Sequence, residues 1–346
     1  MSDAPRLWMR HESRSSERRA PLTPEDAAVL VAHGVPVTVE ESPQRAFPLG
    51  DYRAAGCATA PAGSWTGAPA DTYVLGLKEL PEDPGRLIHR HIFFGHAYKG
   101  QSGAAELLGR FTAGGGSLLD LEYLTDEDGR RLAAFGHWAG YVGAALAVLH
   151  RRDRLTVPLA PLGRAELDAA LRDSRTDDGL RALVTGALGR CGSGAREAFA
   201  TAGIEPTCWD LAETRRLDRA ALLDHDILVN AVLTSRPVPP FLTAEHLDTP
   251  GRRLSVVSDV TCDVTSDCNV LPLNDRPTTW EQPVRRLPGL DVIAIDNLPS
   301  LLPAEASRSF SADLLPHLLD LGGPPWERCL RTFHAAQRSV QESAHA

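Results

Sequence analysis

The sequence lacks the cysteine spacing of a secreted, disulfide-stabilised domain. Its 346 residues include six cysteines, with no pair separated by only two residues and no dense cysteine framework. This usage is typical of a reducing compartment. The first 19 residues contain five arginines and no apolar core, so they do not indicate a signal peptide. We therefore expect a cytoplasmic protein.

The sequence also lacks an excess of positive charge. Its 45 acidic residues outnumber its 36 lysines and arginines, which gives a formal net charge of −9. No global field draws such a molecule to phosphate backbones or anionic lipid, so we expect no nucleic-acid partner and no membrane partner. Residues 132–149 reach the minimum length of a membrane helix but are mostly Ala and Gly. A buried helix packed closely between two domains is the better interpretation.

The hydrophobic pattern indicates an α/β protein of two domains. Hydrophobic residues make up 43% of the chain, and apolar runs alternate with helical patterns along it. Thr23 is expected to be an N-cap before Pro24, with Gly34 ending that helix. Strands are expected at residues 35–40, 72–77, 92–95, 117–121, 182–185, 206–209, 227–232, 254–260 and 292–295. Further helices are expected at residues 101–112, 164–171 and 195–202, and from 311 onward.

A glycine-rich segment follows the strand expected at residues 182–185. Gly186, Gly189 and Gly192 have the spacing GxxGxxG, and the next helix is expected after Gly194. Such a turn brings backbone N–H groups and a helix N-terminus close to a pyrophosphate. The spacing is not GxGxxG, so a tight strand-to-helix turn without a ligand is the alternative.

An acidic residue follows at the position suited to a ribose. Asp210 comes directly after the strand expected at 206–209, 18 residues after Gly192. A carboxylate there accepts hydrogen bonds from the ribose hydroxyls and repels a 2′-phosphate, which favours NAD over NADP. Arg215 and Arg216 are suitable partners for a 2′-phosphate, so they complicate this choice.

Two titratable residues directly follow expected strands of the first domain. Lys78 comes after residues 72–77, and His96 comes after residues 92–95. Ligands of open α/β sheets gather at the carboxyl ends of the strands, where a lysine and a histidine can share proton transfer near neutral pH. Position alone does not separate this interpretation from a solvated lysine and a capping or core histidine.

Several polar residues near the same strand ends are candidates for binding a carboxylate. Arg19 offers a guanidinium suited to bidentate binding. The further donors are Lys99, Gln101, Arg130 and Arg131. Ordinary surface charge is the alternative. No metal site is predicted, because His89 and His91 lack the i, i+4 spacing and a third ligand.

Seven strings occur in order along the chain. They are EESPQ (40–44), PAGSW (61–65), GLKE (76–79), HAYK (96–99), GRRLAAFG (129–136), GALGRCGSG (186–194) and DNLPSLLP (296–303). Together they resemble the NAD-dependent, lysine-forming saccharopine dehydrogenases, relatives of alanine dehydrogenase. One string departs from that family, since NVLP stands at 269–272 where the family often has NPIP.

The resemblance implies two Rossmann-like domains with a cleft between them. Residues 1–132, joined by helices at about 311–346, form the substrate-side domain, and residues 133–310 form the NAD-binding domain. Lys78 and His96 are implied to be the acid/base pair. The acids implied to tune this pair electrostatically are Glu17, Glu79 and Glu122.

The resemblance also implies which residues hold the ligands. The substrate-binding positions are Arg19, Lys99, Gln101, Arg131, Phe135 and Asp263. The NAD-binding positions are Arg130, Gly186, Gly189, Arg190, Gly192, Asp210, Thr214, Leu233, Val260, Asp296, Asn297 and Leu298.

The implied activity is the reversible oxidation of a secondary amine, saccharopine, to L-lysine and 2-oxoglutarate. The expected partners are therefore a small amino acid and a keto acid. One alternative is a related reductive aminase or imine reductase of a specialised pathway, including an alanine-dehydrogenase-like reaction on ammonia. Another is a dinucleotide-binding protein without turnover, against which the presence of Lys78 and His96 counts.

Overall fold

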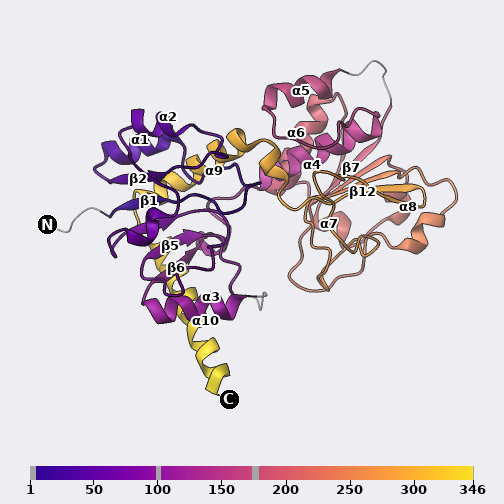
Figure 1. The fold of residues 1–346 in the computed structure, drawn as a ribbon. Helices are drawn as coiled ribbons and strands as arrows, with labels where there is room; N and C mark the ends of the chain where they lie inside the picture. The colour runs from indigo at the N-terminus through magenta and orange to yellow at the C-terminus, as the bar shows by residue number, and fades with distance from the viewer. Residues whose placement is uncertain (1–4, 99–102, 174–178, 346) are drawn as a thin grey trace. The chain divides into compact units, whose positions relative to one another are not determined.

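The computed structural model describes residues 5–98, 103–173 and 179–345, and these form two compact units (Figure 1). Unit 1 comprises Met1–Ala134 and Ala306–Ala346, and unit 2 comprises Phe135–Glu305. Each unit contains one six-stranded sheet flanked by helices. The predicted α/β class with two Rossmann-like units is therefore confirmed.

The sheet of unit 1 is parallel throughout and has the order β3-β2-β1-β4-β5-β6. Its strands are β1 (Leu7–Met9), β2 (Val37–Glu40), β3 (Ala58–Ala60), β4 (Tyr73–Leu75), β5 (Arg90–Phe93) and β6 (Ser117–Asp120). The order reverses between β1 and β4, so the ligand-binding position of this doubly wound sheet is at the carboxyl ends of these two strands.

The helices of unit 1 come from both ends of the chain. They are α1 (Pro24–Ala32), α2 (Leu49–Ala54), α3 (Ala104–Gly114), α9 (Pro303–Leu318) and α10 (Pro324–His345), with short 3-10 turns at Ser64–Gly67 and Leu121–Tyr123. Thr23 caps α1 and Pro24 is its first residue, as predicted. From the C-terminal segment, Phe333 packs against Phe111 of α3, with ring centroids 5.5 Å apart.

The sheet of unit 2 has the order β11-β12-β10-β9-β7-β8, and only the edge strand β11 is antiparallel. Its strands are β7 (Ala182–Thr185), β8 (Thr207–Trp209), β9 (Ile227–Asn230), β10 (Val256–Asp259), β11 (Arg285–Leu287) and β12 (Leu290–Ile293). Here the order reverses between β7 and β9. The glycine-rich turn follows β7 and therefore lies at this switch point.

The helices of unit 2 include a closely packed pair. They are α4 (Gly136–Arg151), α5 (Arg164–Arg172), α6 (Arg190–Thr201), α7 (Leu211–Thr214) and α8 (Arg219–Leu223), with 3-10 turns at Ala244–Asp248 and Leu298–Leu301. A Cβ at Gly140 of α4 would overlap the backbone of Cys191, and one at Gly194 of α6 would overlap that of His137. Glycine is needed at both positions because the two helix backbones touch there.

Helix α6 begins earlier than expected. The sequence predicted a turn through Gly194 and a helix from residue 195, whereas the helix starts at Arg190 with Gly189 as its N-cap. Glycine normally disfavours a helix interior, but Gly192 and Gly194 lie where a side chain would meet backbone atoms. Close packing outweighs the helix propensity. Similarly, α9 starts at Pro303 rather than near residue 311.

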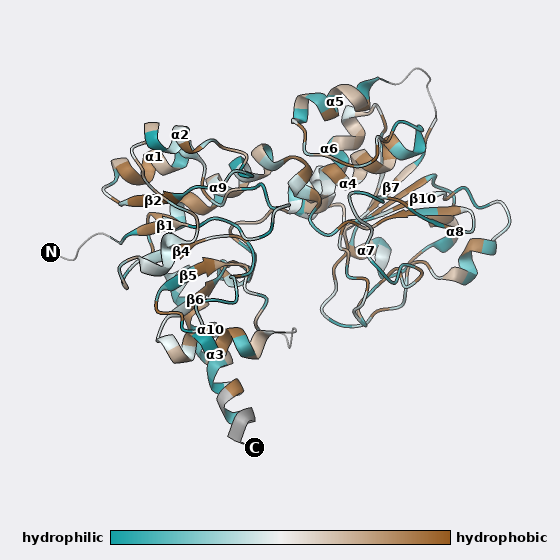
Figure 2. Cartoon of the chain, in the orientation of Figure 1, coloured by the Kyte–Doolittle hydropathy of each residue, from teal (hydrophilic) through white to brown (hydrophobic). Residues whose placement is uncertain are grey.

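Hydrophobic residues concentrate in the strands of both units (Figure 2). The Ala/Gly-rich helix α4 is buried over 11 of its 16 residues, which agrees with its interpretation as a core helix. None of the helices within the described residues combines the length and the hydropathy that a membrane crossing needs.

Candidate active site

Lys78 lies just beyond β4, at the switch point of the sheet of unit 1. Leu77 is fully buried and Lys78 is half-buried, so the chain leaves the core at this residue. The segment after β5 runs alongside it, because the Phe94 N–H donates to the Leu77 carbonyl at 3.2 Å. β4 and β5 are adjacent, as expected, but they end at Leu75 and Phe93, two residues earlier than the sequence predicted, so Lys78 and His96 each lie three residues beyond a strand end.

His96 has an unusual backbone conformation. Its φ is +47°, in the left-handed region that few non-glycine residues adopt, and its side chain is 58% exposed. Such strain is found most often at functional sites. A Cβ at the preceding Gly95 would come within 3.1 Å of the Asp120 carboxylate, so glycine lets this turn pass close to β6.

An ion-pair chain links His96 to Arg131. The Nδ1 atom of His96 lies 3.8 Å from one carboxylate oxygen of Glu122, and the Arg131 guanidinium lies 3.3 Å from the other. The Glu122 side chain is largely buried and that of Arg131 is 41% exposed. The structure therefore brings together one member of the expected acid/base pair, one expected tuning acid and one expected substrate residue.

Asp120 is the last residue of β6 and contacts the backbones of Glu122 and of Gly95, the residue before His96. Its side chain is buried and accepts a hydrogen bond from the Glu122 N–H at 2.9 Å. Burial raises the pKa of Asp120 to about 6, against the opposing effect of hydrogen bonds from the Glu122 and Gly95 backbones. The sequence analysis did not select this residue, since an aspartate ending a strand looks like an ordinary turn residue.

Arg19 and Glu17 form a buried bidentate ion pair in unit 1. The Nε atom of Arg19 lies 2.8 Å from Oε1 of Glu17, and its Nη2 atom lies 2.6 Å from Oε2. Burial alone would raise the pKa of Glu17, but the charges of Arg19 and Lys78 hold it below its ordinary value. Glu17 therefore engages the Nε–Nη2 edge of the guanidinium.

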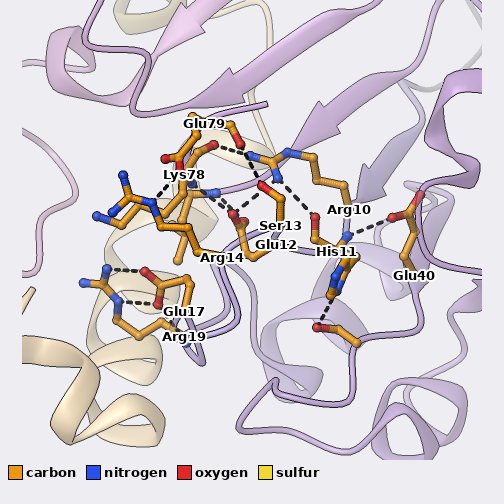
Figure 3. Close-up of polar contacts among 12 residues, drawn as sticks. Arg10, His11, Glu12, Ser13, Arg14, Glu17, Arg19, Glu40, Lys78 and Glu79 are labelled. Atoms are coloured by element: carbon orange, nitrogen blue, oxygen red, sulfur yellow. Dashed lines mark hydrogen bonds and ion pairs between the residues drawn. The ribbon is translucent and has the colours of Figure 1, made fainter. Parts of the chain in front are cut away.

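Glu79 pairs with Arg14, and both side chains are about half exposed (Figure 3). Burial raises the pKa of Glu79, but the hydrogen bond from Arg14 and the nearby positive charges outweigh it, so the pKa lies below the ordinary value. Two ionised carboxylates, Glu17 and Glu79, therefore act electrostatically on Lys78.

The remaining substrate candidates are less closely grouped. Lys99 and Gln101 lie outside the described residues. Phe135 is the N-cap residue of α4, and Asp263 is a half-buried residue in the loop after β10, both in unit 2. Arg130, expected near the cofactor, is in unit 1 with its side chain 79% exposed and 3.8 Å from the Asp128 carboxylate.

The glycine-rich turn of unit 2 has the geometry of a phosphate cradle. Gly186 has a φ of +74°, and a Cβ on Gly192 would overlap the backbone oxygen of Gly186. Gly189 is exposed and caps the 12-residue helix α6, whose first residue is Arg190. An exposed backbone turn at a helix N-terminus favours a pyrophosphate both geometrically and electrostatically.

Asp210 lies beside this turn. One carboxylate oxygen accepts a hydrogen bond from the Leu188 N–H at 2.9 Å, and the other accepts one from Leu211 at 2.8 Å. The residue also caps α7 in a capping box with Glu213. Each carboxylate oxygen retains acceptor capacity for a ribose hydroxyl.

A cavity of about 360 Å³ adjoins α7. Its walls include Leu211, Thr214, Val232, Pro239 and Phe241, which are mostly apolar, together with Arg215 and Arg219. Its volume and lining suit a flat heteroaromatic group such as adenine. Of the predicted cofactor residues, Thr214 lines the cavity, while Leu233 is next to Val232 and 65% exposed.

The other expected cofactor residues follow β10 and β12. Val260 continues from β10 and donates its N–H to the Asn230 carbonyl at 3.0 Å. After β12, Asp296 is exposed and Asn297 has a φ of +83°. Leu298 is 2% exposed, so its side chain belongs to the core and only its backbone is suited to ligand contact.

Sequence reasoning missed Arg10 and Glu12, which follow β1 and contact the backbone around Lys78 (Figure 3). The sequence feature that could have identified Arg10 and Glu12 is the one that identified Lys78, because all three are charged residues that follow a short apolar run. The run Leu7–Met9 is only three residues long and gives a weak pattern.

Comparisons with known proteins place the chain in a family. Residues 8–142 match the model of the alanine dehydrogenase/PNT N-terminal domain, and residues 175–343 match that of the C-terminal domain. The chain is 41% identical to saccharopine dehydrogenase [NAD(+), L-lysine-forming] of Schizosaccharomyces pombe, covering 95% of this chain and 98% of that protein. It is 43% identical to the enzyme of the same description from Emericella nidulans, covering 91% and 92%.

Solved structures agree at the level of the fold. An L-alanine dehydrogenase aligns over 97% of this chain and 98% of its own, with a TM-score of 0.67 and 17% identity. The chain belongs to the alanine dehydrogenase/PNT family and, within it, to the saccharopine dehydrogenases described as NAD-dependent and L-lysine-forming.

Proposed function

We propose that this protein is an NAD-dependent oxidoreductase that converts saccharopine and water reversibly into L-lysine and 2-oxoglutarate. The observation that carries the proposal is the identity of about 40% to lysine-forming saccharopine dehydrogenases over nearly the whole length of both chains. Lys78 and His96, two residues capable of proton transfer at adjacent strand ends, support it independently.

Unit 2 fits a dinucleotide. The turn at Gly186 and Gly192 leaves no room for a side chain, the exposed N-terminus of α6 favours a diphosphate, and Asp210 favours a ribose without a 2′-phosphate. Gly189, Arg190 and Thr214 lie on the same turn and the adjoining cavity. When bound, NAD supplies the hydride acceptor for the carbon that bears the amine.

Unit 1 supplies the proton transfers. The neutral member of the pair Lys78 and His96 takes the proton that leaves the secondary amine as the carbon–nitrogen double bond forms. That proton is released to solvent, so the same group is neutral again when it takes a proton from the water that attacks the carbon. The pair passes the protons of this water to the amine nitrogen as the carbon–nitrogen bond breaks. Lysine and 2-oxoglutarate are then released.

Three carboxylates lie around the pair. Glu17 and Glu79 interact electrostatically with Lys78, and Glu122 lies 3.8 Å from Nδ1 of His96. Arg131, held at 3.3 Å by Glu122, and Arg19, held by Glu17, are the guanidinium groups proposed to bind substrate carboxylates. Lys99, Gln101, Phe135 and Asp263 complete the proposed substrate set.

Steady-state NADH oxidation tests the proposal. Lysine with 2-oxoglutarate is compared with ornithine and 2-oxoglutarate, and with ammonia and pyruvate. We expect kcat/KM to be highest for lysine with 2-oxoglutarate. Preferred use of ammonia and pyruvate would instead assign an alanine-dehydrogenase-like reaction, and NAD binding without turnover on any pair would leave a binding protein.

A further inference from the structure

The main chain on both sides of Lys78 is held by an ion pair from another strand. The two carboxylate oxygens of Glu12 accept hydrogen bonds from the backbone N–H groups of Leu77, at 2.6 Å, and Lys78, at 3.0 Å. The Arg10 guanidinium donates to the Lys78 carbonyl through Nη2 and lies 3.3 Å from Glu12 through Nη1 (Figure 3). Arg10, Glu12 and the Lys78 peptide groups thus form a closed set of contacts.

This ion pair is buried and built into the sheet. The side chains of Arg10 and Glu12 are 1% and 6% exposed. Arg10 continues β1 along β4, since its N–H donates to the Leu75 carbonyl at 2.9 Å. A Cβ at Gly76 would overlap the Arg10 guanidinium, so glycine at this position makes room for it.

Two further side chains, Gln44 and the buried Glu40, hold Glu12 and the adjacent His11 in place. The Gln44 amide donates to the Glu12 carbonyl at 2.8 Å. Glu40 accepts hydrogen bonds from the N–H groups of His11, Gly63 and Trp65, at 2.7 to 2.9 Å. The segment after β1, which carries Glu12, is therefore anchored to β2 and to the loop after β3, so Glu12 is held in place where it contacts the backbone of Lys78.

We infer that Arg10 and Glu12 are positioning residues that fix the backbone of Lys78 and so direct its amine in proton transfer. The inference rests on the proposed function, because it assigns these residues to the same catalytic step. Two desolvated charges are costly to bury, and replacing such a pair with apolar residues is often neutral for stability. Stability therefore does not explain why Arg10 and Glu12 are buried here, whereas their contacts with the peptide groups of Lys78 do.

The expected effect follows from geometry. A proton-transfer group must lie within hydrogen-bond reach of its partner, and a displacement of about 1 Å can reduce the rate roughly 100-fold. Glu12→Gln retains the shape but replaces one acceptor oxygen with a donor, so it cannot accept from both N–H groups. We expect kcat to fall roughly 10- to 100-fold, with KM for both substrates changing less than about threefold.

Arg10→Lys provides a second variant, in which the charge is kept. A single ammonium does not reproduce the fork that joins Glu12 to the Lys78 carbonyl, so we expect kcat to fall roughly tenfold. Asp226→Asn is the matched control in unit 2. Asp226 is a buried carboxylate that accepts from a backbone N–H, of Arg181 at 3.0 Å, and from Arg253 at 2.9 Å. It should lower stability without changing kcat.

A double-mutant cycle separates positioning from general destabilisation. In a Lys78→Met background, Glu12→Gln should change the residual kcat by less than about twofold, because the group it positions is absent. Equal losses in both backgrounds would overturn the inference.

A measurement without turnover distinguishes this inference from the proposed function. Lys78 and Lys99 are the only two lysines in the sequence, so reductive methylation with ¹³C-formaldehyde labels few sites. The Lys78 signal is assigned by its loss in Lys78→Met. We expect Glu12→Gln to move it toward the position of free dimethyl-lysine, and Asp226→Asn to leave it in place. An unmoved signal in Glu12→Gln overturns the positioning role, whereas full turnover of Lys78→Met overturns the proposed catalytic step.

Discussion

At the residue scale, the molecule places charged side chains where apolar strands end. Lys78 and His96 follow β4 and β5, with Glu17 and Glu79 acting electrostatically on Lys78 and Glu122 lying 3.8 Å from His96. His96 also has a left-handed backbone conformation. The left-handed backbone of His96 and the buried Arg19–Glu17 ion pair are both unfavourable for stability. Such features are expected where function, rather than stability, determines which residues are present.

The proton-transfer pair gives a direct prediction. Lys78→Met keeps the volume of the stem and removes the titrating amine, and His96→Gln removes the imidazole. Each should lower kcat by roughly 10²- to 10⁴-fold, the usual contribution of general acid–base catalysis. NADH binding, followed by fluorescence, should stay near that of the unmodified protein. If both variants kept full turnover and an unchanged pH profile, the pair would be structural.

Asp120 predicts a pH dependence of stability. Its pKa is about 6 in the folded protein and is that of an ordinary aspartate, about 4, after unfolding. Between these values the folded state holds more protons, so its free energy of unfolding falls as pH rises. Relative to Asp120→Asn, the unmodified protein should lose on the order of 2–3 kcal/mol of stability between pH 4 and pH 7.

Denaturant unfolding at several pH values measures this difference. Asp226→Asn is the control of opposite sign. The Arg181 N–H and Arg253 outweigh the effect of burial and hold the pKa of Asp226 below its ordinary value. Its contribution is therefore present above the ordinary aspartate pKa and is lost as pH falls. A stability difference for Asp120→Asn that stays constant with pH would contradict the burial effect.

At the scale of elements, glycines let backbones approach each other around β7 and α6. Gly186, Gly192 and Gly194 are all in positions where a Cβ would meet backbone atoms. The same approach brings helix α4 against α6 and leaves the helix N-terminus exposed beside Asp210. The turn after β7 and the first turns of α6 thus pack in the core and also form the proposed pyrophosphate site.

Gly192→Ala tests this arrangement. The added methyl group meets the Gly186 backbone oxygen, so the turn must shift, and we expect a loss of roughly 1–3 kcal/mol in stability and at least a tenfold weaker binding of NADH. Gly109→Ala in α3 is the matched helical control, since nothing lies within 4 Å of its Cβ position. It should raise stability by up to about 1 kcal/mol. Similar NADH affinity in both variants would contradict the assignment of the glycine turn as the pyrophosphate-binding site.

Asp210→Ala tests the cofactor preference. Loss of a charge-assisted hydrogen bond to the ribose, together with loss of repulsion toward a 2′-phosphate, should lower the ratio of kcat/KM for NADH over NADPH by roughly 10- to 100-fold. Asp218→Ala is the control, because Asp218 is also a helix N-cap, at α8, but lies outside the glycine turn. Equal use of both cofactors by the unmodified protein would contradict the assignment of Asp210.

At the scale of the whole molecule, the two units are assembled differently from the sequence. Unit 2 is one continuous segment, whereas unit 1 needs both ends of the chain. The Ala20 N–H donates to Ser307 at 2.8 Å, and the Thr23 N–H donates to Ser311 at 3.0 Å, across more than 280 residues. Completion of unit 1 therefore depends on the C-terminal helices.

Hydrogen exchange measured by mass spectrometry can resolve the two units. Phe333 of α10 is 1% exposed and Phe199 of α6 is fully buried. Replacement of either by alanine should cost about 3–5 kcal/mol. We expect Phe333→Ala to speed exchange in the segments of unit 1, including Leu7–Met9 of β1, and Phe199→Ala to do so in unit 2. Equal loss of protection in both units after either substitution would show that they unfold as one.

Much of the fold was determined locally and could be read from the sequence. The cap at Thr23 and the strand at residues 182–185 were predicted and confirmed, whereas the strands before Lys78 and His96 end two residues earlier than predicted. Hydrophobic periodicity and turn chemistry act over a few residues, so they remain visible without tertiary contacts.

Tertiary structure decided what lies beside these residues. The contacts of Glu12 with Leu77 and Lys78 join positions 65 and 66 residues apart, and they exist because β1 pairs with β4 on one edge and with β2 on the other. Likewise, Asp120 acquires its raised pKa mainly through burial, with a further contribution from the charge of Glu122. Strand order and burial depend on interactions across the whole unit, and no local pattern records them.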